Sequence, residues 1–184
     1  WPRPWRVRPV CRSSPLRRTS SRAFLAAARA RAAWVAFSKM AFATPKLFDL
    51  TSLQRETNRI YGYTAKQTLD LAQTLYEKKL LTYPRTDSAF LTDDMGETAT
   101  DIIKVLCEKL SFMEGADFSP EIAKVLNSKK VSDHHAIIPT MELAKADLTA
   151  LPESERNILT LAGARLLMAT AEPYSFEAVT AVFS

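Results

Sequence analysis

This chain has 184 residues, of which only two are cysteines, and none of its uninterrupted apolar stretches approaches about twenty residues. A disulfide framework, a zinc site built on cysteines and a transmembrane span are therefore not expected. The net charge of +5 is unevenly distributed, because residues 1–45 hold nine Arg, one Lys and no acidic residue. The rest of the chain holds fifteen basic and twenty acidic residues, so the basic total does not indicate a nucleic-acid surface there.

Residues 1–45 form a head rich in Arg, Ala, Ser and Pro that is predicted to be disordered or non-native. An organelle transit peptide would have this composition, and so would a basic arm that binds nucleic acid non-specifically. We favour translation in a wrong reading frame ahead of a coding region that resumes near Lys46, because the chain begins with Trp1. A helix over residues 23–35 would have an apolar face interrupted by arginines.

Residues 46–148 are predicted to form a helical domain, so the fold class is mainly α. Thr51 with Gln54 predicts the start of a short helix, and Thr64 with Gln67 predicts a capping box that opens a second helix. Apolar residues then recur at helical spacing along this second helix, which delivers the chain to residue 83. They are Ala65, Leu69, Ala72, Leu75, Tyr76 and Leu80.

Four further elements follow the second helix. Thr92 is expected to cap a helix with the apolar stripe Met95, Ala99, Ile102, Ile103, Leu106 and Leu110, and Ser119 with Pro120 to open another. Residues 149–184 are predicted to contain a helix from Pro152 to about Ala171 and a strand over Ser175–Phe183. This terminal strand would leave an unpaired edge.

Residues 82–88, with the sequence TYPRTDS, are the most informative stretch of the chain. Pro84 disfavours helical geometry at Tyr83, so Tyr83 is expected in extended chain, where residues i and i+2 project to the same face. The Tyr83 hydroxyl and the Arg85 guanidinium could therefore reach one phosphate. Because a phenol is almost fully protonated at neutral pH, a cation such as Arg85 would have to assist a nucleophilic Tyr83.

The second informative stretch, residues 133–140, holds both histidines of the chain. His134 is predicted to be an acid, a hydrogen-bond donor or a phosphate ligand, with Asp133 as a residue that could orient it. Adjacent side chains diverge, so His134 and His135 are not both expected to face one small site. Together with Tyr83, this stretch indicates phosphoryl chemistry.

Three strings resemble, in the same order, the tyrosine-bearing cleavage domain of type IA DNA topoisomerases, most closely in the topoisomerase III branch. They are residues 47–58 (LFDLTSLQRETN), 81–88 (LTYPRTDS) and 134–140 (HHAIIPT). The resemblance covers residues 46–184 and begins in mid-domain, which also favours the wrong-frame origin of the head. Residues 149–184 would then enter truncated gate and toroid domains.

The resemblance implies that Tyr83 attacks a phosphodiester of single-stranded DNA and becomes joined to the 5′-phosphate, while Arg85 holds that phosphate. His134 would contact the same phosphate, and His135, Gln54 and Arg55 would contact the DNA. In such a magnesium-dependent isomerase, another strand passes through the gap before religation, without ATP.

The resemblance also implies that the acidic residues that bind Mg²⁺ lie in an N-terminal Toprim domain, which we expect to be missing here. No metal ligand is therefore assigned to this chain, and the chain alone is expected to be inactive. The implied setting is intracellular, cytoplasmic or at the nucleoid, rather than an organelle or a membrane.

Two alternatives compete with this interpretation. A tyrosine recombinase also combines Tyr, Arg and His, but its nucleophile follows the Arg and His residues, whereas Tyr83 precedes His134. The other alternative is a non-catalytic DNA-binding or partner-binding helical module derived from a topoisomerase. Gln54 and Arg55 would then belong to a solvated helix face, and the two histidines to an ordinary surface.

Overall fold

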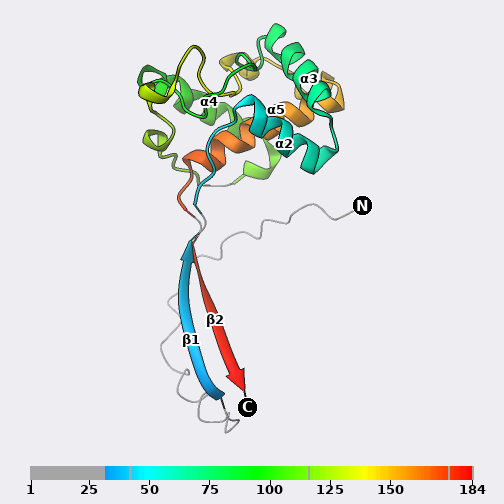
Figure 1. Ribbon diagram of the computed structural model, residues 1–184. Coiled ribbons are helices and arrows are strands. Elements are labelled where there is room, and N and C mark those ends of the chain that lie inside the picture. Colours follow the sequence, from blue (N-terminus) through cyan, green and yellow to red (C-terminus); the bar gives the residue numbers. More distant parts are fainter. Residues whose placement is uncertain (1–31, 42, 116, 174, 184) are drawn as a thin grey trace. The chain divides into compact units, whose positions relative to one another are not determined.

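The computed structural model describes residues 32–41, 43–115, 117–173 and 175–183, which fall into two compact units. Among these residues, the unit Phe42–Tyr174 contains four α-helices: α2 (Leu50–Tyr61), α3 (Ala65–Glu77), α4 (Gly96–Lys109) and α5 (Glu153–Thr170) (Figure 1). The other unit contains a two-stranded sheet of β1 (Ala32–Ala41) and β2 (Ser175–Phe183). Helices dominate, so the predicted mainly α class is confirmed. Short 3₁₀ turns lie between the helices at Asp93–Met95, Ser111–Met113, Ile122–Lys124, Ser128–Lys130, Met141–Ala144 and Leu148–Ala150.

The two strands pair antiparallel, from Ala41 opposite Ser175 to Ala32 opposite Phe183. The strand predicted at the C-terminal end is β2, but the expectation that it would be unpaired is wrong. One of its edges is hydrogen-bonded to β1, which removes half of the exposed backbone groups that an isolated strand presents.

Strand β1 lies within the basic head, residues 1–45, which was predicted to be disordered or non-native. The helix considered over residues 23–35 is wrong for residues 32–35, which belong to β1, and residues 23–31 lie outside the described residues. Residues 32–41 contain Trp, Val and Phe, which are enriched in strands, so their pairing with β2 outweighs the helical preference of the interspersed alanines.

A capping box begins α2 at Asp49, and not at Thr51 as expected from the sequence. The Asp49 carboxylate accepts from the Ser52 N–H at 2.6 Å, and the Ser52 hydroxyl accepts from the Asp49 N–H at 3.1 Å. An aspartate is also favoured there because its charge complements the positive end of the helix dipole. The predicted start of α3 is confirmed, with Thr64 and Gln67 forming a capping box.

Two buried threonines connect α2 to α3. The hydroxyl oxygens of Thr57 and Thr68 are 2.7 Å apart, and neither side chain is exposed to solvent. Gly62 ends α2 with a φ of 72°, a left-handed conformation that lets the chain reverse into α3. The result is a helical hairpin whose second helix ends six residues before Tyr83.

The helix predicted from Ser119 onward is wrong, since only the 3₁₀ turn Ile122–Lys124 forms there. The Leu91 N–H donates to the Val125 carbonyl at 2.9 Å, and the Asn127 N–H donates to the Leu91 carbonyl at 2.9 Å. These bonds use backbone groups that a continuing helix would need. Pairing with a distant segment therefore replaces the local helix.

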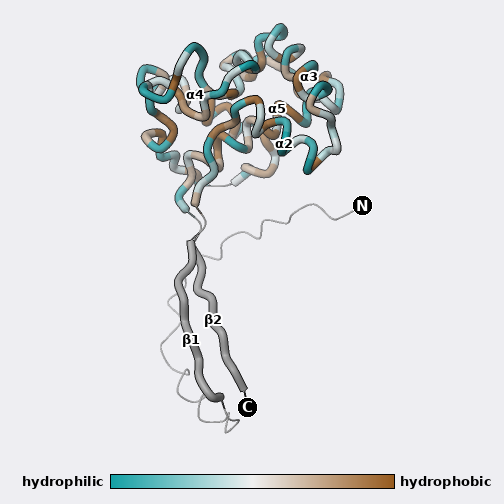
Figure 2. Tube along the Cα trace, viewed as in Figure 1, coloured by the Kyte–Doolittle hydropathy of each residue, from teal (hydrophilic) through white to brown (hydrophobic). Residues whose placement is uncertain are grey.

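Helix α5 lies in the hydrophobic core of the helical unit and packs on α3 and α4 (Figure 2). It starts after Pro152, as predicted, and Gly163 allows its close approach to α4, since a Cβ there would lie 2.6 Å from Leu106 Cδ2. The domain boundary expected at residues 148 and 149 does not separate the two compact units, because α5 belongs to the same unit as α2–α4. No α-helix among the described residues is long and apolar enough to cross a membrane.

The corrected start of α2 can be tested by stability measurements. Asp49→Ala should lower the free energy of unfolding by about 1 kcal/mol, because it removes the N-cap hydrogen bond. Thr51→Ala, an exposed position in the first turn, is the matched control and should change it by less than about 0.5 kcal/mol. Urea unfolding followed by circular dichroism would measure both. Equal losses of unfolding free energy in the two variants would favour Thr51 as the N-cap instead of Asp49.

Candidate active site

The end of α3 directs the chain toward Tyr83. The Leu80 N–H donates to the Leu75 carbonyl at 2.9 Å and the Lys79 N–H to the Tyr76 carbonyl at 2.8 Å, which is the hydrogen-bond pattern of a Schellman cap. Lys79 occupies the left-handed position of this cap, with a φ of 60°. Leu75 and Leu80 are both buried, so the cap is closed by apolar packing.

The segment that follows, residues 81–83, pairs with residues 136–140. The Thr82 N–H donates to the Ile138 carbonyl at 3.0 Å, and Leu81 forms an antiparallel bridge with Pro139. The Thr82 hydroxyl adds two bonds, donating to the Ala136 carbonyl at 3.2 Å and accepting from the Ile138 N–H at 3.0 Å. This pairing brings the histidine segment beside Tyr83.

The segment before α2 joins the same assembly. Phe48 forms an antiparallel bridge with Ile137, and the Leu50 N–H donates to the Thr86 carbonyl at 3.0 Å. The Thr86 hydroxyl in turn donates to the His134 carbonyl at 2.8 Å. The three strings singled out in the sequence, residues 47–58, 81–88 and 134–140, are thus hydrogen-bonded to one another.

A partly buried arginine of α5 supports this junction. The Arg165 guanidinium lies 4.1 Å from the centre of the Phe48 ring and 3.7 Å from a Glu56 carboxylate oxygen. Burial lowers the pKa of Arg165, while the Glu56 carboxylate opposes that change. The arginine therefore serves as a packed structural cation and not as a free surface charge.

Two aromatic rings contact the Tyr83 ring. The His134 ring lies with its centre 4.3 Å away and tilted by 43°, and the Tyr76 ring meets Tyr83 edge-on at 5.4 Å and 77°. Tyr83 is half-buried, whereas His134 and Tyr76 are exposed. The candidate nucleophile and the candidate phosphate ligand are thus in contact.

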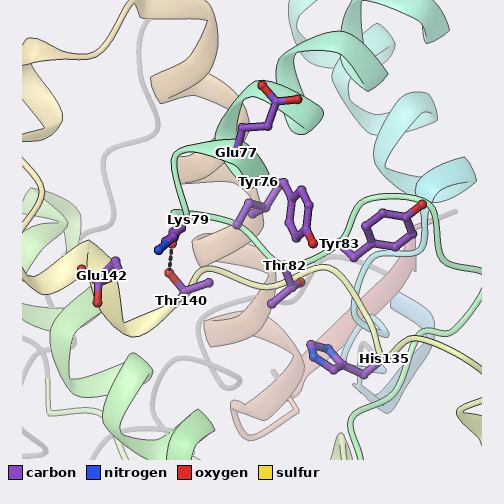
Figure 3. Close-up of a pocket in the computed structure, with 9 residues that line it drawn as sticks. Tyr76, Glu77, Lys79, Thr82, Tyr83, His135, Thr140 and Glu142 are labelled. Atoms are coloured by element: carbon purple, nitrogen blue, oxygen red, sulfur yellow. Dashed lines mark hydrogen bonds between the residues drawn. The ribbon is translucent and has the colours of Figure 1, made fainter.

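An open pocket of about 580 Å³ lies beside these rings (Figure 3). Its lining residues are Tyr76, Glu77, Lys79, Leu81, Thr82, Tyr83, His135, Thr140 and Glu142. In Figure 3 the Tyr83 ring extends away from the part of the pocket that is formed by Lys79 and Thr140. The His135 Nδ1 proton is donated to the Ala136 carbonyl at 2.8 Å, so Nε2 is the ring nitrogen left for a ligand.

Both histidines therefore lie close to Tyr83, although only one of them was expected to face a small site. His134 contacts the Tyr83 ring, and His135 lines the pocket that Tyr83 also lines. His134 is not among the residues that line this pocket, so Tyr83 meets His134 with its ring and His135 across the pocket.

The remaining candidate residues have different surroundings. Arg85 is exposed and is not among the residues that line the Tyr83 pocket. Arg55 is exposed on α2, whereas the Gln54 side-chain amide donates to the Ala65 carbonyl at 3.1 Å and so joins α2 to α3. Asp133 is exposed as well. The structure therefore groups Tyr83 with the histidines, and leaves Arg85, Arg55 and Asp133 on the surface.

Tyr76 is a site residue that sequence reasoning missed. Its helical spacing assigned it to the apolar stripe of α3, yet its side chain is 41% exposed and lies against Tyr83. Its position as the penultimate residue of α3, next to the segment that carries Tyr83, was the available signal.

The described residues do not fit a metal site of their own. Among them, no group of three or more His, Cys, Asp or Glu side chains is placed to hold a metal ion. A hard cation such as Mg²⁺ needs several oxygen ligands, which the described residues do not bring together.

Comparison with known proteins identifies the family. A family model described as DNA topoisomerase matches residues 20–184. The chain belongs to this family. The match includes all three motif strings and also β1. It begins within residues 1–45, which is further toward the N-terminus than the resemblance seen in the sequence.

The similar proteins agree with this assignment. The chain is 41% identical over 152 residues to DNA topoisomerase 3 of Bacillus licheniformis, covering 76% of this chain and 20% of that protein. It is 40% identical over 139 residues to DNA topoisomerase 3 of Staphylococcus saprophyticus, covering 73% and 19%. The predicted resemblance to topoisomerase III is confirmed. The chain spans about a fifth of the length of these topoisomerases.

A solved topoisomerase has the same fold. Full-length topoisomerase I from Thermotoga maritima matches 88% of this chain and 27% of its own, with a TM-score of 0.58. The sequence identity of 23% is too low for residue roles to be transferred, so this likeness concerns the fold alone.

The Thr82 side chain provides a test of how this candidate site is assembled. Thr82→Val should lower the free energy of unfolding by about 1–2 kcal/mol, because it removes the bond to Ala136 and leaves the buried Ile138 N–H without its partner. Thr82→Ser keeps the hydroxyl and should lose less than half as much. Denaturant unfolding would measure both changes. A valine variant as stable as the serine variant would show that the hydroxyl is dispensable.

Proposed function

We propose that this chain is the tyrosine-bearing part of a type IA DNA topoisomerase of the topoisomerase III kind, which cleaves and rejoins single-stranded DNA through Tyr83. The observation that carries the proposal is the contact of the Tyr83 ring with His134, beside an open pocket and at the junction of the three family-like segments. The protein would then act on the DNA of the cell, at the nucleoid.

The proposed reaction is a displacement at phosphorus. The Tyr83 oxygen attacks the phosphorus and forms a new P–O bond, the bond from phosphorus to the 3′-oxygen breaks, and the phenolic proton leaves. The 3′-oxygen takes up a proton and becomes a hydroxyl. The phosphotyrosyl bond keeps the energy of the phosphodiester, so another strand can pass through the gap and the reverse reaction can rejoin the ends without ATP.

His134 and Arg85 have separate roles in this proposal. His134 lies against the Tyr83 ring and would donate a hydrogen bond to a phosphate held at the hydroxyl. Arg85, two residues from Tyr83, would turn its exposed guanidinium onto the strand and neutralise charge that develops at phosphorus. His135 and Arg55 would contact the DNA, whereas Gln54 has its amide engaged with Ala65.

Mg²⁺ would come with a further part of the enzyme. Because the described residues offer no fitting ligand group, we propose that its ligands belong to a Toprim domain outside this chain. The 184 residues alone would then form no covalent complex with DNA.

Tyr83→Phe should abolish the covalent complex while leaving DNA binding within about twofold, because only the attacking oxygen is removed. A denaturing gel with labelled single-stranded DNA and magnesium, run with and without a separately supplied Toprim domain, would detect the complex. Tyr61→Phe is the matched control, since burial raises the pKa of Tyr61 and makes it a poor nucleophile. A covalent complex that persists in Tyr83→Phe contradicts the assignment of Tyr83. If no covalent complex forms under any condition, the chain is better explained as a non-catalytic binding module.

Arg85→Ala should slow both cleavage and religation by about 10²- to 10³-fold, the cost of removing one group that stabilises transition-state charge. Arg85→Lys should recover part of the rate, because it keeps the charge but loses the planar fork. Thermal melting would serve as the folding control, and little change is expected because Arg85 is exposed. Unchanged rates in Arg85→Ala would remove this residue from the site.

A further inference from the structure

The pocket beside Tyr83 holds features that the displacement at phosphorus does not use. Two of its lining residues, Tyr83 and His135, are already assigned, but Tyr76, Glu77 and Glu142 have no role in that chemistry. The pocket is large enough for one nucleobase with its sugar.

Tyr76 is the feature that indicates an aromatic occupant. It is 41% exposed, although a tyrosine ring would normally be covered in a core stripe, and its ring meets Tyr83 edge-on at 5.4 Å. In Figure 3 the Tyr76 and Tyr83 side chains lie beside each other, and the His135 side chain lies below them. Exposed aromatic rings beside a strand-binding site are the usual stacking surface for unpaired bases.

The charges of the pocket disfavour a phosphate. Its lining includes the carboxylates of Glu77 and Glu142 against the single ammonium group of Lys79. Glu142 is paired with Lys145 at 3.2 Å, and Glu77 has no ion pair among the described residues. An uncharged base therefore fits this space better than the backbone of the strand.

The threonine hydroxyls of the pocket are already engaged. The Thr82 hydroxyl bonds to Ala136 and Ile138, and the Thr140 hydroxyl donates to the Lys79 carbonyl. Neither threonine is therefore free to read the edge of a base, whereas the Tyr76 ring remains open. This arrangement allows recognition by stacking, which does not depend on the identity of the base.

We propose that the pocket receives an unpaired base of the single strand, next to the phosphate that Tyr83 attacks, and that Tyr76 stacks on this base. The inference rests on the proposed function, since Tyr83 fixes where the strand lies. Stacking would hold the nucleotide while the Tyr76 edge keeps the Tyr83 ring oriented toward the phosphate.

The experiment pairs Tyr76 variants with strands that lack one base. The cleaved phosphate is first mapped from the Tyr83 adduct formed with the supplied Toprim domain. An abasic residue is then placed at each position flanking that phosphate, and adduct formation and strand affinity are measured for the parent chain, Tyr76→Ala and Tyr76→Phe. Thermal melting checks that the variants are folded.

Tyr76→Ala should weaken binding of the intact strand about tenfold, since stacking contributes about 1–3 kcal/mol per base, and Tyr76→Phe should bind like the parent. An abasic residue at one position of the strand should weaken binding by the parent chain to the same extent. On that strand, Tyr76→Ala should bind no more weakly than the parent chain. An equal loss from Tyr76→Ala on intact and abasic strands, or no loss on any strand, would overturn the inference.

A photocrosslink separates failure of this inference from failure of the proposed function. A strand carrying 5-iododeoxyuridine should crosslink to Tyr76, with Tyr61 as the control residue. If Tyr83-dependent adducts form but no crosslink reaches Tyr76, the function stands and the pocket inference is wrong. If no adduct forms, the function is wrong, and the pocket inference falls with it unless the crosslink to Tyr76 is still found.

Discussion

The backbone pairing between residues 81–83 and 136–140 is the interaction on which the candidate site depends. The Thr82 main chain and hydroxyl together make three hydrogen bonds to Ala136 and Ile138, more than fifty positions away in sequence. Because Ile138 is buried and its N–H is satisfied only through Thr82, the two segments are stable as a pair. Without this pairing, Tyr83 and the histidines would belong to separate loops.

The helices around this junction set its position. The α2–α3 hairpin, closed by Thr57 and Thr68, ends at the Schellman cap from which the chain enters residues 81–83. The Lys78 ammonium lies 2.6 Å from the Glu155 carboxylate at the start of α5, which fixes the end of α3 against the core. A rigid helical frame thus supports side chains that lie on short extended segments, as precise positioning of a nucleophile requires.

In the proposed chemistry, this chain supplies some of the groups of the active site and the rest of the enzyme supplies the others. In this proposal, this chain would supply the nucleophile, its histidine neighbour and the stacking surface, all within one compact unit. The divalent cation would be held elsewhere in the enzyme, because no suitable ligand group for it occurs among the described residues. Such a division would prevent cleavage unless both parts meet on the strand, so an open break could form only in an assembled enzyme.

The sequence by itself determined the family, the nucleophile candidate and most of the helices. Capping boxes and apolar periodicity are local signals, so α3 and α5 began where they were predicted, and Tyr83 before Pro84 lies outside any helix, as expected. Tertiary structure alone decided the pairing of Thr82 with Ile138, the replacement of a helix after Ser119 by pairing with Leu91, and the exposure of Tyr76. Those outcomes depend on hydrogen bonds and packing between residues far apart in the chain, which no local pattern encodes.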